Sequence, residues 1–95
     1  MSGAHAEGRR TVASAAGGHA EGIESKVYAA ASHAEGRNTT VNSSGEGVHA
    51  EGYWTNANKT GAHAEGSRTT VDATGGHAEG YDTNVTGDYG HAEGY

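Results

Sequence analysis

Histidine and glutamate, spaced two residues apart, are the side chains of this sequence best suited to chemistry. The tetrapeptide His-Ala-Glu-Gly occurs seven times and contains every histidine of the chain. Successive copies begin 14 residues apart, except that 16 residues separate His33 from His49. An imidazole beside a carboxylate can exchange a proton, form a hydrogen bond or help to bind a metal ion. The candidate residues are His5, Glu7, His19, Glu21, His33, Glu35, His49, Glu51, His63, Glu65, His77, Glu79, His91 and Glu93.

Three kinds of chemistry could use this pair. A catalytic dyad needs one concave pocket with a perturbed pair, whereas this pair recurs in every repeat with no activated nucleophile beside it. We therefore expect no enzymatic activity and no catalytic residue. A network of His–Glu hydrogen bonds is the favoured interpretation. The alternative is Zn or Ni bound by histidines that neighbouring copies of the chain bring into one plane; its ligands would be His5, His19, His33, His49, His63, His77 and His91.

The period of the repeat selects the architecture that positions these side chains. Counting each motif histidine as position 1, position 7 is Thr or Ser and position 9 is Val or Ala. Fourteen residues are too few for a helical-hairpin repeat, so we predict an all-β parallel solenoid, or β-roll, with two short strands per rung. The strands are expected over positions 14 to 3 and positions 7 to 9. Glycines with positive φ should turn the first corner: Gly8, Gly22, Gly36, Gly52, Gly66, Gly80 and Gly94.

Composition limits the size of the core. The 95 residues include 17 glycines and no phenylalanine, proline or cysteine, so a conventional compact core and a disulfide framework are both excluded. Strict periodicity argues against disorder, because a flexible linker has no reason to keep Thr and Val at fixed positions. We predict a single repeat domain over residues 1–95 with about six and a half rungs, spaced about 4.8 Å apart. The longer step predicts a two-residue bulge at 43–48.

The direction of the motif side chains follows from strand geometry. Alternate residues of a strand face opposite sides, so Ala20 should point inward with Ser25 and Val27, while His and Glu point outward. Outward positions such as 6 and 8 vary between repeats, but His and Glu do not. Since only a contact on that face would hold them constant, we expect an inter-chain His–Glu ladder against another copy of the chain.

The repeat resembles a known family. Residues 32–41 are similar to the 14-residue repeats of the left-handed parallel β-roll heads of trimeric autotransporter adhesins, which read approximately S-V-A-I-G-x-x-A-x-A-x-G. The HAEG form also resembles segments of phage tail-fibre proteins. The resemblance covers essentially the whole chain and implies a roll that assembles as a homotrimer. Two features depart from the adhesin pattern: His and Glu replace Val and Ile, and only Gly87 has the adhesin-like place in the second turn.

Charge and hydropathy narrow the class of partner. The net charge is −6 with neutral histidines, and no basic track suits a nucleic acid. No apolar run approaches the roughly 20 residues of a membrane span, so we expect no membrane insertion. No secretory signal is visible in residues 1–22, yet the resemblance implies an extracellular or virion-surface location.

The sequence thus predicts a non-catalytic structural or adhesive fibre segment, the shaft or head of a phage tail fibre or surface adhesin. The alternatives are a self-assembling extracellular filament subunit, joined end to end, and a metal-binding solenoid scaffold. A cell-surface glycan or receptor is a further candidate partner, because aromatics such as Tyr53 and Trp54 could stack on sugar rings. The favoured interpretation of these aromatics is that they pack the turns of neighbouring chains together.

Overall fold

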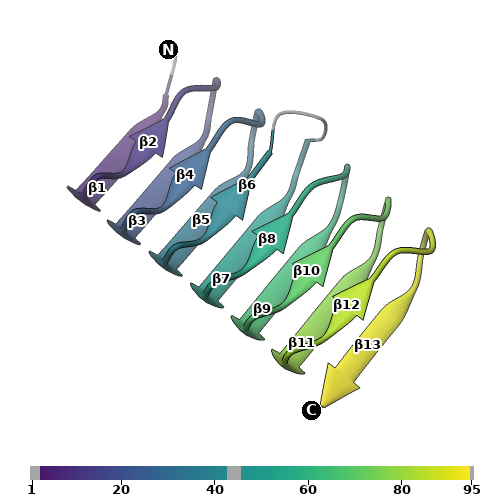
Figure 1. Cartoon of the computed structure of the whole chain (residues 1–95). Helices are drawn as coiled ribbons and strands as arrows, with labels where there is room; N and C mark the ends of the chain where they lie inside the picture. The colour runs from purple at the N-terminus through teal and green to yellow at the C-terminus, as the bar shows by residue number, and fades with distance from the viewer. Residues whose placement is uncertain (1–2, 43–45, 95) are drawn as a thin grey trace.

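The chain forms a parallel β-solenoid with one long and one short strand in each complete rung. The computed structural model describes residues 3–42 and 46–94, and every strand pairing within them is parallel (Figure 1). The predicted fold class is therefore confirmed. The long strands are β1 (His5–Arg9), β3 (His19–Ile23), β5 (His33–Arg37), β7 (His49–Tyr53), β9 (His63–Ser67), β11 (His77–Tyr81) and β13 (His91–Gly94).

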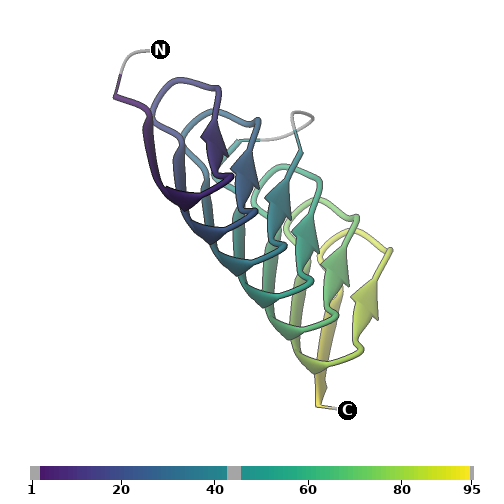
Figure 2. The same cartoon turned by 60° about the vertical axis from the view of Figure 1, so that its left-hand side comes forward.

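Long and short strands form separate sheets. The seven long strands pair in sequence order, and the six short strands form the second sheet. Figure 2 shows the chain winding round one axis, with the two sheets on opposite sides of each rung. The molecule measures 34 × 22 × 12 Å. The short strands are β2 (Val12–Ala13), β4 (Lys26–Val27), β6 (Thr40–Val41), β8 (Asn56–Ala57), β10 (Thr70–Val71) and β12 (Asn84–Val85).

The register of the sheets places like residues over like residues. His19 pairs with His33 and Glu21 with Glu35, and this register continues across the longer step, where His33 pairs with His49. The additional residues are therefore accommodated between β6 and β7. Residues 43–45 of the predicted bulge at 43–48 lie outside the described residues. Exact register turns each sequence position into a straight column along the fibre axis.

The interior is a thin core of small side chains. Motif alanines such as Ala34 and Ala50 are fully buried in the long strands, and Val27, Val41 and Val71 face them from the short strands. Each buried valine contributes about 1.5–3 kcal/mol by leaving water. The fully buried position-2 alanines of β3, β5, β7, β9 and β11 point inward, as the alternation argument predicts.

The glycines at position 4 occupy a different place from the one predicted. The long strands cover positions 1 to 5 and the short ones positions 8 and 9, so these glycines lie within the long strands. Their φ angles are positive, near +115°, as expected. The corner itself is made at position 6, by non-glycine residues in the left-handed region, with φ between 57° and 59°. They are Arg10, Glu24, Asn38, Trp54, Arg68 and Asp82.

A column of buried hydroxyls runs along position 7. The Ser25 hydroxyl lies 2.8 Å from the Glu21 carbonyl oxygen and 3.0 Å from that of Gly36, and the Thr39 hydroxyl donates to Ser25 Oγ at 2.9 Å. Further along the column, the Oγ1 atoms of Thr55, Thr69 and Thr83 have no hydrogen-bond partner among the described residues. A buried polar atom without a partner is destabilising by about 1–3 kcal/mol.

Replacing Thr55 with valine is therefore expected to stabilise the fold by about 1 kcal/mol, because valine has nearly the same shape and removes an unpaired hydroxyl. Thr39→Val is the matched control. It should destabilise the chain, since the Thr39 hydroxyl is hydrogen-bonded to Ser25. Chemical denaturation of the two variants measures the difference. A loss of stability in Thr55→Val would mean that the Thr55 hydroxyl has a partner, such as a buried water.

Candidate functional site

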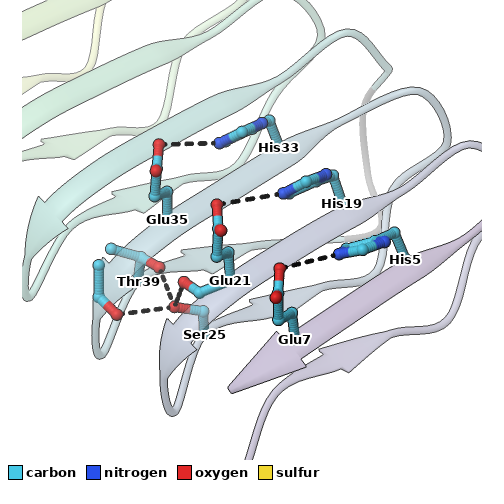
Figure 3. A network of polar contacts seen from close by, with 9 residues as sticks. His5, Glu7, His19, Glu21, Ser25, His33, Glu35 and Thr39 are labelled. Carbon is cyan, nitrogen blue, oxygen red and sulfur yellow. Dashed lines mark hydrogen bonds and ion pairs between the residues drawn. The ribbon is translucent and has the colours of Figure 1, made fainter. Parts of the chain in front are cut away.

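The outer face of the seven-stranded sheet carries two parallel ladders, one of histidines and one of glutamates. In three of the long strands Figure 3 shows the side chains at positions 1 and 3 on the same outer face, and in β3, β5, β7, β9 and β11 the alanine between them is fully buried. In the central rungs the motif side chains remain partly exposed, for example 34% for His49 and 40% for Glu51. Each rung thus presents an imidazole and a carboxylate on one continuous surface.

The imidazole rings stack face to face along the fibre axis. Centroids of neighbouring rings lie 4.6–4.9 Å apart, and their planes are within 15° of parallel. This spacing equals the distance between neighbouring strands, so the register of the sheet imposes it. Because a neighbouring ring covers both faces of each inner ring, the ring edges form the accessible surface of the ladder between its two end histidines.

Each glutamate is paired with the histidine of its own strand. The Nε2 atom of the histidine lies 3.2–3.5 Å from Oε1 of the glutamate two residues later in all seven motifs. Figure 3 shows three of these pairs. In the His77–Glu79 pair the distance is 3.5 Å and no hydrogen bond is formed. Because a carboxylate only accepts, the hydrogen-bonded rings carry a proton on Nε2, which leaves Nδ1 as the acceptor of a neutral ring.

These hydrogen bonds lower the pKa of two ladder glutamates. The bond from His19 lowers the pKa of Glu21, and the bond from His49 lowers the pKa of Glu51, although partial burial opposes both shifts. A lowered folded-state pKa means that folding favours the carboxylate. These glutamates therefore stabilise the fold when the pH is above 4.5, the usual glutamate pKa. Their contribution is lost as the pH falls through the lowered pKa of the folded state.

The variant Glu51→Gln is accordingly expected to be less stable than the parent protein near neutral pH, and the difference should shrink as the pH falls below 4.5 and the Glu51 carboxylate is protonated. Denaturation curves at a series of pH values measure this. Glu46→Gln, a change outside the ladders, controls for the general effect of net charge. A stability difference that does not depend on pH would show that the Glu51 carboxylate makes no favourable charged interaction.

The ladders do not form a metal site within one chain. Across residues 3–42 and 46–94, no group of three or more histidine, cysteine or acidic side chains is arranged to hold a metal ion. The Nε2 atoms are directed at glutamates of the same strand. The Zn or Ni site considered from the sequence requires histidines from three chains, and it stays a prediction.

A second group of side chains lies at the corner after the long strands. Tyr53, Trp54 and Tyr81 are exposed there, and the guanidinium of Arg37 lies 5.6 Å from the centre of the Tyr53 ring. Arg68 lies similarly over Tyr81, at 5.9 Å. No spacing rule in the repeat predicts that these arginines contact aromatic rings. The register could have revealed one pair, because it places Arg37 beside Tyr53.

The comparisons with known proteins do not assign the chain to a family, so its fold class rests on the structure. No protein-family model, curated protein or solved structure matches the chain. Within the part of the chain that the structure describes, no helix has the length and apolar character needed to cross a membrane. The parallel β-solenoid with its 14-residue repeat is therefore the established part of the predicted resemblance.

Proposed function

We propose that this chain is a non-catalytic structural segment of a surface fibre, and that it assembles as a homotrimer through the face bearing the His–Glu ladders. A solenoid with straight columns and a thin, fully packed core is suited to a rigid shaft or head. The resemblance to trimeric adhesin heads and phage tail fibres supports three as the number of chains. It also supports an extracellular or virion-surface location.

One observation carries the proposal: the ladder side chains are half-exposed in the single chain yet identical in every rung. His33, for example, is 34% exposed and Glu35 is 42% exposed. Outward positions on the other sheet vary freely, with Lys26, Thr40 and Asn56 at equivalent places. Surface that is free of contacts has no reason to avoid such variation. A second copy of the same face would cover the ring edges and the carboxylates.

The electrostatics of such an interface are favourable. Each carboxylate is already paired with an imidazole of its own strand, so a neighbouring chain does not bury an isolated charge, which would be strongly unfavourable. The Nδ1 acceptors and the second carboxylate oxygens remain to bond across the interface. The repeated ladder also opposes slipped registers between chains, because a displaced chain would leave pairs uncovered at both ends.

The mass of the native assembly tests the proposal. Native mass spectrometry of chelator-treated protein should give three times the mass of the 9.6 kDa chain. A trimer that retains Zn or Ni after this treatment would replace the hydrogen-bonded ladder with the metal scaffold. A monomer at micromolar concentration would contradict the proposed trimer.

A further inference from the structure

We propose that the corner after strands β7, β9 and β11 is a binding site for a short neutral saccharide. A hollow of about 510 Å³ opens there across three consecutive rungs. Its walls combine aromatic rings, one cation, one anion, a hydroxyl and an amide. The lining residues are Tyr53, Trp54, Arg68, Thr70, Asp82 and Asn84.

The aromatic wall is exposed rather than packed. Trp54, the only tryptophan of the sequence, is 50% exposed, and Tyr53 is 42% exposed. Their rings are 6.1 Å apart in an edge-on arrangement, and both residues line the hollow. Trp54 also adopts a φ of 57°, a conformation that is uncommon for a bulky residue. The other position-6 residues share this φ, so the corner of the solenoid imposes the conformation, and the Trp54 ring at this corner remains half-exposed.

The surrounding columns provide the space. At position 5, the residue between Tyr53 and Tyr81 is Ser67, which pairs with both in the sheet. Serine is the smallest of the three side chains in this part of the column, and the hollow opens beside it. Arg68 stays extended over the Tyr81 ring, 5.9 Å from its centre. This cation–π contact favours a position of the guanidinium at the hollow that Arg68 lines.

The polar groups match the chemistry of a sugar. A pyranose ring has an apolar face of C–H groups, which stacks on an aromatic ring, and hydroxyls at its rim that need donors and acceptors together. Trp54 supplies the flat apolar surface. Asp82 accepts, Arg68 donates, and Asn84 does both. Because one cation and one anion balance, the hollow has no net charge from its lining and suits a neutral saccharide better than a sialylated one.

The site gives an adhesive role to the proposed fibre, but it does not depend on the trimer, since one chain supplies all six residues. The competing explanation is that the aromatics pack against a neighbouring chain. That explanation predicts that removing Trp54 changes the oligomeric state, whereas the saccharide site predicts that it changes binding.

Titration with cellobiose, lactose and diacetylchitobiose tests the site, with sialyllactose as the acidic comparison. Trp54 is the sole tryptophan, so its fluorescence reports directly on the hollow. At least one neutral disaccharide should change the emission in a saturable way. Isothermal calorimetry should then show at least a tenfold loss of affinity in Trp54→Ala and in Asp82→Ala. Tyr89→Ala, which removes an exposed aromatic at the other turn, should bind normally.

The outcomes separate this proposal from the preceding one. If none of the neutral disaccharides binds, or if binding survives both Trp54→Ala and Asp82→Ala, the saccharide site is wrong whatever the oligomeric state. Stronger binding of sialyllactose would also contradict it. Circular dichroism of the variants excludes loss of the fold as the cause. Saccharide binding by a monomer would retain the site and overturn only the trimer.

Discussion

Gly52→Ala is expected to destabilise the solenoid by several kcal/mol, which is a large share of the roughly 5–15 kcal/mol that stabilises a typical domain. A Cβ atom on Gly52 would lie 2.0 Å from the carbonyl oxygen of Gly66 in the next rung. Backbone atoms on that side cannot move away without separating β7 from β9. The φ of +119° is itself unfavourable for alanine. Denaturation followed by circular dichroism measures the loss.

Two other glycines separate the causes of this effect. Gly94 has a similar φ, +115°, but no atom that its Cβ would meet within 4 Å, so Gly94→Ala should show the conformational strain alone. Gly87 also has open space around it, and its φ is outside the left-handed region. Gly87→Ala should therefore change stability by less than about 0.5 kcal/mol. If Gly52→Ala lowered the stability as little as Gly87→Ala, the backbones of neighbouring rungs would not approach each other as closely at Gly52 as described.

The same glycines show how far the sequence could predict the structure. Their invariance in the repeat indicated a positive φ, and the structure has one at each of them. The sequence could not distinguish a glycine required by a turn from one required by a neighbouring backbone, because both need a residue without a side chain. The turn is made instead by varied residues such as Arg10, Glu24 and Trp54, whose types give no signal of left-handed backbone.

The periodicity of the sequence predicted the structure best where one geometric rule determines the direction of a side chain. Alternation along a strand was enough to place Ala50 inside and His49 and Glu51 outside. The stacking of His49 on His63 follows from the register that the 14-residue step implies, whereas its stacking on His33 spans the 16-residue step, where the period does not imply it. By contrast, whether the Thr55 hydroxyl has a partner depends on details of side-chain rotation, which the sequence does not specify.

The double variant His49→Ala/Glu51→Ala is expected to weaken trimer association by more than tenfold, equivalent to over 1.4 kcal/mol. It removes one ring and one carboxylate from the centre of the proposed interface in each of three chains. Central, desolvated contacts dominate the energetics of protein interfaces. Sedimentation velocity over a dilution series would show the trimer dissociating at a higher concentration than in the parent protein.

The single chain provides an alternative reason for the constant ladders, and this experiment distinguishes the two. His49 stacks on His33 at 4.9 Å and on His63 at 4.6 Å, and it bonds to Glu51 at 3.2 Å. If these contacts within one chain explain the invariance, the double variant should lose folding stability while association, or its absence, stays unchanged.

We expect the double variant to weaken association between chains more than it lowers the folding stability of one chain. A hydrogen bond between partly exposed side chains stabilises a fold by only about 0.5–1.5 kcal/mol, so the unfolding free energy of the separated chain should fall only modestly. Asp72→Ala removes an exposed carboxylate next to β10, in the other sheet, and should leave both association and stability unchanged. A double variant that still forms the trimer with parental affinity would show that the chains meet through another face, because no central contact of the ladder would then contribute to their association.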